Sequence, residues 1–277
     1  TLSDLGMRGK ALANLQAAIK VPHGIVLITG PTGSGKTTTL YSILSIVSTI
    51  RVNVVTLEDP VEYQIEGVNQ VQVNPGAGLT FASGLRSFLR QDPNVIMVGE
   101  IRDEETADLA IQASLTGHLV FATLHTNDAA GALPRLLDMK VEPYLLASSI
   151  TVVAAQRVTR KICDNCKEEY VPEPAVIEDI KRELGPLYEA WKQTNPEMTK
   201  KAVERKSEIL LYRGKGETCK VCGGSGYKGR IGIFEVMSIS SKIGQLIMER
   251  ATASVINHQA VVEGMILMMQ DGYLKAL

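Results

Sequence analysis

A glycine-rich segment of eight residues constrains the fold of this chain more than any other feature of its sequence. The segment GPTGSGKT occupies residues 30–37, directly after an apolar run at residues 25–29 and before a stretch with the pattern of a helix. It fits the P-loop pattern at every position, and a P-loop works only between a strand and a helix. The sequence therefore predicts a strand, a phosphate-binding loop and a helix in succession.

The chemistry of such a loop assigns roles to its residues. Successive backbone N–H groups and the helix N-terminus surround a β-phosphate with partial positive charge. The Lys36 ammonium reaches the β- and γ-phosphate oxygens, and the Thr37 hydroxyl ligates Mg²⁺. We therefore expect ATP and Mg²⁺ as cofactors, and the residues expected to bind the nucleotide are Gly30, Pro31, Thr32, Gly33, Ser34, Gly35, Lys36, Thr37 and Thr38.

Short apolar runs alternate with helical patterns after this loop. Apolar runs at residues 52–57, 95–98 and 119–123 predict strands, and residues 104–115 predict a helix. Alternation of this kind is typical of an α/β fold with a mainly parallel sheet.

Two acidic residues follow predicted strands and are candidates for the catalytic machinery. Ligands of open α/β sheets bind at the carboxyl ends of the strands, so Glu62 and Glu100 are expected to position the attacking water and Mg²⁺. Gly99 occupies the place of the ordinary Walker-B aspartate, which leaves Glu100 as the carboxylate on the metal side, together with Thr37. Asp59 is equally well explained as a helix cap or a surface ion pair.

Four cysteines form two Cys-x-x-Cys pairs, which suit a tetrahedral Zn²⁺ site, although four free thiols remain the alternative. The expected zinc ligands are Cys163, Cys166, Cys219 and Cys222. We expect a RecA-like core over residues 1–160, a tetracysteine metal-binding lobe over residues 161–229, and a strand with a helical C-terminal subdomain over residues 230–277. Because the lobe is rich in Lys and Glu, zinc is expected to replace a hydrophobic core there.

The charge balance argues against nucleic acid as the partner. The 277 residues include 29 basic and 30 acidic side chains, for a formal net charge of -1, so no global positive field is available to bind a phosphate backbone. Aromatic residues, which would stack on bases, make up only 5% of the chain. The sequence contains no apolar run of membrane-spanning length and no signal-peptide pattern, and we expect a cytosolic protein.

Five segments together resemble the type II/type IV secretion ATPase superfamily over nearly the whole chain. They are GPTGSGKTTTLY, TLEDPVEY, RQDPNVIMVGEIRDEETA, TGHLVFATLHTNDA and AQRVTRKICDNC. The resemblance implies a RecA-like P-loop NTPase core in which Glu62 is the catalytic base, Glu100 the Walker-B-like carboxylate and His125 a sensor of the γ-phosphate. It assigns His118 to the same histidine box, although either histidine could instead be structural.

The resemblance also implies partners and a location. Three arginines match the family, Arg86, Arg90 and Arg102, but each could be a structural ion pair. The trans-acting arginines of the family lie largely in an upstream domain, so we expect the chain to continue before Thr1 and to be monomeric or weakly associated by itself. The full protein is expected to be a hexamer on the inner face of the cytoplasmic membrane, bound to an inner-membrane platform protein and to no nucleic acid.

The expected function is Mg²⁺-dependent ATP hydrolysis that powers type IV pilus assembly. The retraction ATPases of pili lack the tetracysteine lobe, which favours assembly over retraction. A type II secretion ATPase is the alternative. A RecA-like nucleic-acid motor and a non-hydrolysing, nucleotide-dependent scaffold are the rivals from other classes.

Overall fold

The computed structural model describes residues 1–277, and its contacts divide the chain into two compact units. Unit 1 comprises Thr1–Arg157 and Phe234–Ile266, and unit 2 comprises Val158–Ile233 and Leu267–Leu277. Two long strands, β6 (Ile150–Ile162) and β9 (Tyr227–Ser238), contribute residues to both units. Each unit has a hydrophobic core of its own.

The sheet of unit 1 is mainly parallel. Its seven strands lie in the order β3-β2-β4-β5-β1-β6-β9, and the first six in this order are paired in parallel. The remaining strands are β1 (Gly24–Thr29), β2 (Val54–Glu58), β3 (Val68–Gln72), β4 (Val95–Val98) and β5 (Leu119–Leu124). Every residue of β1, β2, β4 and β5 is buried, as expected for parallel strands that are covered on both faces. The predicted α/β fold class is confirmed.

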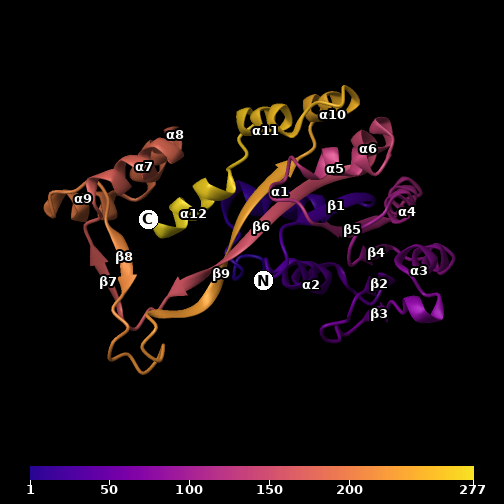
Figure 1. The fold of residues 1–277 in the computed structure, drawn as a ribbon, viewed down its shortest axis with the longest axis horizontal. Coiled ribbons are helices and arrows are strands. Elements are labelled where there is room, and N and C mark those ends of the chain that lie inside the picture. Colours follow the sequence, from indigo (N-terminus) through magenta and orange to yellow (C-terminus); the bar gives the residue numbers. More distant parts are fainter. The chain divides into compact units, whose positions relative to one another are not determined.

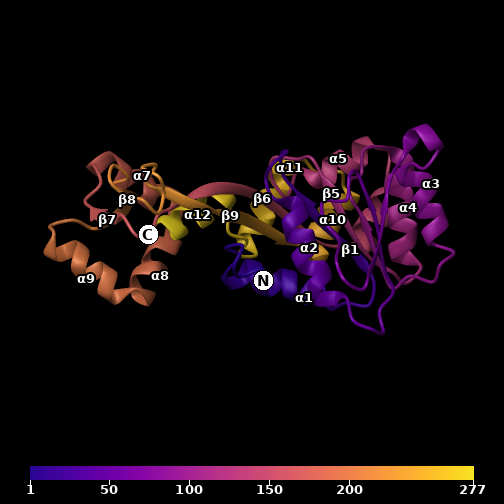
Figure 2. The same cartoon turned by 90° about the horizontal axis from the view of Figure 1, so that it is seen from below.

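Helices cover both faces of this sheet (Figure 1). α2 lies on one face, and α3 and α4 lie on the other (Figure 2), which is the arrangement that right-handed crossovers between parallel strands produce. The core on the α2 side joins Leu15, Leu40 and Leu44 to alternate strand residues such as Val26 and Phe121. The helices of unit 1 are α1 (Gly9–Ala18), α2 (Lys36–Val47), η1 (Pro75–Ala77), α3 (Phe81–Phe88), α4 (Glu104–Leu115), α5 (Ala132–Asp138), α6 (Pro143–Ser149), α10 (Ser241–Met248) and α11 (Ala253–Val262).

Side-chain caps account for the starts of three of these helices. Thr80 accepts a hydrogen bond from the Ser83 N–H at the start of α3, and Asp103 accepts one from the Thr106 N–H at the start of α4. Ser240 caps α10 in the same way. Each cap satisfies an N–H group that has no partner within its helix.

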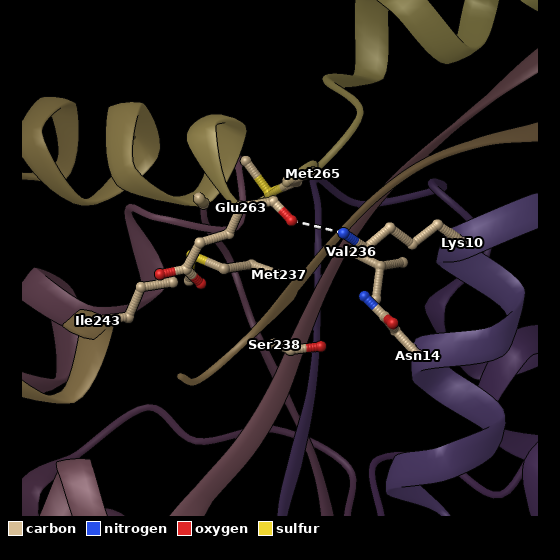
Figure 3. Close-up of a pocket in the computed structure, with 9 residues that line it drawn as sticks. Lys10, Asn14, Val236, Met237, Ser238, Ile243, Glu263 and Met265 are labelled. Atoms are coloured by element: carbon tan, nitrogen blue, oxygen red, sulfur yellow. Dashed lines mark hydrogen bonds between the residues drawn. The ribbon is translucent and has the colours of Figure 1, made fainter. Parts of the chain in front are cut away.

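The C-terminal helices α10 and α11 belong to unit 1, where α1 holds the end of α11 (Figure 3). The Lys10 ammonium donates a hydrogen bond to the carbonyl oxygen of Glu263, the residue after α11. A cation is favourable there because the last carbonyl groups of a helix carry partial negative charge. The Glu263 carboxylate accepts hydrogen bonds from Ser240 (2.9 Å) and Gln259 (2.7 Å), so one residue joins α1, α10 and α11.

Unit 2 contains a small sheet, four helices and the cysteines. β7 (Lys167–Tyr170) pairs with β8 (Leu211–Gly214) in antiparallel fashion. The helices are α7 (Pro174–Leu184), α8 (Pro186–Thr194), α9 (Pro196–Glu204) and α12 (Met268–Ala276). Four buried residues form the core, with partly buried side chains of α12 packed against them, and these four are Ile180, Leu184, Tyr188 and Ile209.

This core corrects one sequence expectation. The long charged stretch between the cysteine pairs is helical, and its apolar residues recur at helical spacing on one face, so unit 2 buries a core without zinc. The division into three domains at residues 160 and 229 stays a prediction. By contacts, the end of β9 with α10 and α11 groups with unit 1, and α12 groups with unit 2.

None of the helices in either unit combines the length and the apolar character that a crossing of the bilayer requires.

Candidate functional site

The carboxyl ends of four parallel strands meet at one edge of the sheet in unit 1. β1 leads into the P-loop, β2 into the segment that contains Glu62, β4 into Glu100 and β5 into His125. These four strands are consecutive neighbours in the order β2-β4-β5-β1. Since ligands of α/β sheets bind at this edge, the topology gathers the predicted nucleotide-binding and catalytic residues on one side.

The P-loop connects β1 to α2 in the predicted way. Gly35 directly precedes α2 and has φ 86°, a left-handed conformation that favours glycine. Gly30 has φ 149°, and a Cβ atom there would lie 2.4 Å from the Gln156 carbonyl oxygen and 2.6 Å from the Ser34 hydroxyl. The Gln156 side chain donates a hydrogen bond of 2.7 Å to the Ser34 carbonyl, which fastens the loop to β6. Only glycine fits at position 30.

Lys36 lies over the loop with its ammonium directed at backbone oxygens. Its Nζ atom donates to the carbonyl oxygens of Gly30 (2.9 Å) and Pro31 (3.2 Å). Burial lowers the pKa of Lys36 below its usual value. Thr37 and Thr38 lie in the first turn of α2, where backbone N–H groups have no intrahelical partner. An anion at this place would find N–H donors, the positive end of α2 and an ammonium group.

Glu100 is at the centre of a charged cluster beside the P-loop. One carboxylate oxygen contacts His125 Nε2 and the other contacts Arg102 Nε, and the Glu100 side chain is only 14% exposed. Burial, with the positive charges of Lys36 and Arg102, lowers the pKa of His125 and favours its neutral form. The structure therefore brings Lys36, Glu100, Arg102 and His125 into one electrostatic group.

Threonine hydroxyl groups tie the ends of the central strands together. The Thr29 hydroxyl, at the end of β1, accepts the Thr126 N–H at 2.9 Å and lies 2.6 Å from the Thr126 hydroxyl. Thr123 donates a 2.6 Å hydrogen bond to the Gly99 carbonyl oxygen, just before Glu100. These bonds hold the segments after β1, β4 and β5 in register, and the sequence analysis did not identify them.

The segment after β2 is held by residues that sequence analysis also missed. Glu62 is exposed, and its backbone N–H donates to the Tyr41 hydroxyl at 3.2 Å. Tyr41 is hydrogen bonded to the carboxylate of Glu58, the last residue of β2, which is buried. A glutamate directly after the apolar run at residues 52–57 was the available signal, because a carboxylate that becomes buried needs hydrogen-bond donors around it.

Other candidates lie apart from this cluster. His118 precedes the amino end of β5, at the opposite edge of the sheet from His125. Its Nδ1 atom lies 2.8 Å from the Ala113 carbonyl oxygen, a contact that closes the turn after α4. The geometry favours the structural role for His118. Arg86 forms an ion pair with Glu105 on α4, and Asp59 is exposed.

The four cysteines of unit 2 form a compact group. Their sulfur atoms all lie within 4.8 Å of one another, with Cys163 and Cys219 4.0 Å apart and Cys166 and Cys222 3.8 Å apart. Tetrahedral Zn²⁺ with Zn–S bonds of about 2.3 Å requires sulfur separations of roughly 3.8 Å, so the donor set fits zinc. A hydrogen bond from the Asn165 side chain to its sulfur lowers the pKa of Cys219 to about 6.

A family model described as Type II/IV secretion system protein matches residues 1–277. The chain belongs to this family. The secretion ATPase family prediction is thereby confirmed, on a match that includes both the P-loop edge of unit 1 and the tetracysteine group of unit 2.

Curated relatives within this family divide between two systems. The chain is 48% identical over 276 residues to the type IV pilus assembly ATPase PilB of Thermus thermophilus, covering 100% of this chain and 29% of that protein. It is 46% identical over 250 residues to the type II secretion system ATPase E of Vibrio cholerae, covering 90% of this chain and 45% of that protein. The chain thus spans less than half the length of these relatives.

Solved structures of an ATPase and of a motor protein share the fold of this chain. The pilus retraction motor PilT with bound ADP matches with a TM-score of 0.61 and 25% identity, over 98% of this chain and 66% of that one. The ATPase DotB of Legionella pneumophila matches with a TM-score of 0.63 and 24% identity, over 99% of this chain and 61% of that one. These matches agree with the α/β architecture of the secretion ATPase family.

Proposed function

We propose that this chain is the catalytic region of an ATPase that hydrolyses ATP with Mg²⁺ to drive type IV pilus assembly. The observation that carries the proposal is the shared edge of the sheet, where the P-loop, the Glu62 segment, Glu100 and His125 follow four neighbouring parallel strands. A chain that only bound MgATP would need a carboxylate for the metal but no second one such as Glu62 to activate water.

Each group at this edge has a role in the proposed reaction. Lys36 and the backbone N–H groups of the P-loop would bind the phosphates, and Thr37 and Glu100 would hold Mg²⁺, which would neutralise charge at the phosphate oxygens. To do so, Lys36 must exchange the carbonyl oxygens of Gly30 and Pro31 for phosphate. Glu100 must likewise loosen its contacts with His125 and Arg102. These exchanges would make His125 sensitive to the γ-phosphate.

Glu62 is the proposed general base. Its side chain is exposed, it follows a strand of the same edge, and its backbone is anchored, so the carboxylate is free to accept a proton from the attacking water. Glu100 is less suited to this role because both of its oxygens already contact cationic or imidazole groups.

We expect Glu62→Gln to keep MgATP affinity within about twofold and to lower kcat by about 10²- to 10⁴-fold, the usual contribution of a general base. The amide can hold the water but cannot accept its proton. Titration calorimetry and phosphate release on the full-length, assembled protein measure the two quantities. Glu66→Gln, an exposed carboxylate four residues further along, is the matched control. Near-normal turnover in assembled Glu62→Gln would reject Glu62 as the base and transfer the role to Glu100 or Asp59.

The biological assignment is tested by complementation. Relatives of similar identity serve pilus assembly and type II secretion, so the second candidate function is type II secretion. The full-length gene is deleted and restored as wild type or as Glu62→Gln, and surface pili and secreted proteins are both measured. Loss of pili with unchanged secretion supports pilus assembly. The reverse result assigns the protein to type II secretion.

The remaining proposals concern assembly and location. We propose that the full-length protein is a hexamer at the inner face of the cytoplasmic membrane, docked on a platform protein, with Zn²⁺ bound by the four cysteines of unit 2. The relatives are named as pilus assembly and type II secretion ATPases, which supports a role in such machinery, and the four clustered sulfur atoms support the metal site. The near-zero net charge supports the absence of nucleic acid among the partners.

A further inference from the structure

We propose that Tyr41 is a positioning residue for the catalytic base: its hydroxyl group joins the backbone of Glu62 to the helix that begins at Lys36, through the buried carboxylate of Glu58. This inference rests on the proposed function, because it concerns the placement of Glu62 in ATP hydrolysis.

Tyr41 connects two segments of the site that the sequence separates. It lies on α2, five residues after Lys36, and is 1% exposed. Its hydroxyl donates a hydrogen bond to Glu58 and accepts the Glu62 N–H at 3.2 Å. The helix that carries the P-loop lysine therefore also holds the main chain of the proposed base.

Glu58 holds the Tyr41 hydroxyl in the orientation that this contact needs. The residue is 3% exposed, and its carboxylate also accepts hydrogen bonds from Thr56 (2.6 Å) and Gln70 (3.0 Å). A carboxylate that receives three donors inside the protein is a fixed acceptor and not a candidate base, since water cannot reach it. With its proton directed at Glu58, the Tyr41 oxygen presents a lone pair to the Glu62 N–H.

The Tyr41 hydroxyl stays protonated under all physiological conditions. Burial, together with the hydrogen bond to Glu58, raises the pKa of Tyr41 to about 12. It can therefore donate to Glu58 and accept from Glu62 at the same time. The protonated hydroxyl fits the donor and acceptor contacts of Tyr41.

The rest of the segment is fastened to β3 and to the Tyr41 ring. Gln70 on β3 donates to the Tyr63 carbonyl oxygen (3.1 Å) and accepts the Ile65 N–H (2.7 Å). The ring of Tyr63 packs edge-on against that of Tyr41, with centroids 4.6 Å apart. Since the Glu62 side chain itself is exposed, these main-chain and ring contacts are what place it relative to α2.

The test uses Tyr41→Phe in the full-length protein. The variant keeps the ring contact with Tyr63 and removes the hydroxyl that accepts the Glu62 N–H, together with the bonds of that hydroxyl to Glu58 and Gln70. We expect kcat to fall by about 10- to 100-fold, the scale of a displaced catalytic group, while the Kd for MgATP stays within about twofold. The matched control is Tyr188→Phe in unit 2, a buried tyrosine whose hydroxyl donates to the Glu208 carbonyl oxygen at 3.2 Å. Wild-type kcat in Tyr41→Phe would overturn the proposal.

A double-mutant cycle separates positioning from a general structural effect. In a Glu62→Gln background, Tyr41→Phe should cause no further loss of kcat, because its effect passes through the missing carboxylate. If Tyr41→Phe lowers kcat by the same factor in the Glu62→Gln background as in the wild type, the proposal is overturned. If Glu62→Gln alone leaves turnover unchanged, the assignment of Glu62 as base has failed; if it slows turnover and Tyr41→Phe does not, only the role of Tyr41 has failed.

Amide hydrogen exchange tests the contact without relying on a folded variant. In the wild-type protein the Glu62 amide should exchange at least about tenfold more slowly than an exposed amide of the same loop such as Glu66. In Tyr41→Phe this protection should disappear, and in Tyr188→Phe it should remain. A Glu62 amide that exchanges as fast as Glu66 in the wild type would overturn the proposal, whatever the stability of the variants.

Discussion

Replacing Lys36 with alanine should weaken MgATP binding by at least about 30-fold and leave the fold of unit 1 intact. The Nζ atom makes its hydrogen bonds only to the Gly30 and Pro31 carbonyl oxygens of the P-loop, and the side chain is absent from the hydrophobic core. The variant therefore loses the positive charge that would contact the ATP phosphates, and it loses no core packing. Removing one partner of a hydrogen-bonded charge pair costs about 2–5 kcal/mol, which corresponds to a loss of affinity of at least about 30-fold.

Calorimetric titration with MgATP measures this loss, and thermal unfolding measures the fold. Lys20→Ala, which removes an exposed lysine of unit 1 outside the P-loop, is the charge-matched control and should bind as the wild type does. Unchanged affinity in a folded Lys36→Ala variant would disprove the assignment of the nucleotide site.

If the four cysteines bind zinc as proposed, removing the metal should unfold the cysteine end of unit 2 and leave the rest of the protein folded. Backbone hydrogen bonds join the segments that carry the two Cys-x-x-Cys pairs. The Cys163 N–H donates to the Gly226 carbonyl oxygen (2.9 Å), and the Lys215 N–H donates to the Cys166 carbonyl oxygen (3.0 Å). Structural zinc contributes about 10–16 kcal/mol in zinc-finger peptides, so these few bonds cannot replace it. The helical core around Ile180 and Leu184 contains no zinc ligand and should persist.

Cys219→Ser and chelation of the wild-type protein should give the same result. We expect about one zinc per chain by elemental analysis, the stoichiometry of one four-thiolate site. After chelation or in Cys219→Ser, protease should cut first near residues 161–167 and 213–230, while MgATP binding is retained. Thr218→Ala, at an exposed neighbouring position, is the matched control. A metal-free protein that resists protease at these residues would return the cysteines to the alternative of four free thiols.

The elements next to the P-loop could be predicted from the sequence because their signals are local. The apolar run before the loop, the glycine positions and the helix after it all appear within about 25 residues, and the structure has β1, the loop and α2 there. The paired cysteines gave an equally direct signal, and their four sulfur atoms lie together. The spacing of apolar residues across 177–191 also carried a helical pattern, but the charged residues between them obscured it.

Sequence alone determined the phosphate loop, the alternation that produces a parallel sheet, and the donor set for a metal, because these depend on residues that are close along the chain or on residue type. Tertiary structure decided which polar residues meet. His118 and His125 flank the same strand, yet only His125 reaches Glu100, because the two ends of a parallel strand lie at opposite edges of the sheet. Strand order, which no local pattern specifies, brought Tyr41 and Glu62 together. The tertiary structure also made the Glu58 carboxylate a buried acceptor for Tyr41 and left the Glu62 carboxylate exposed.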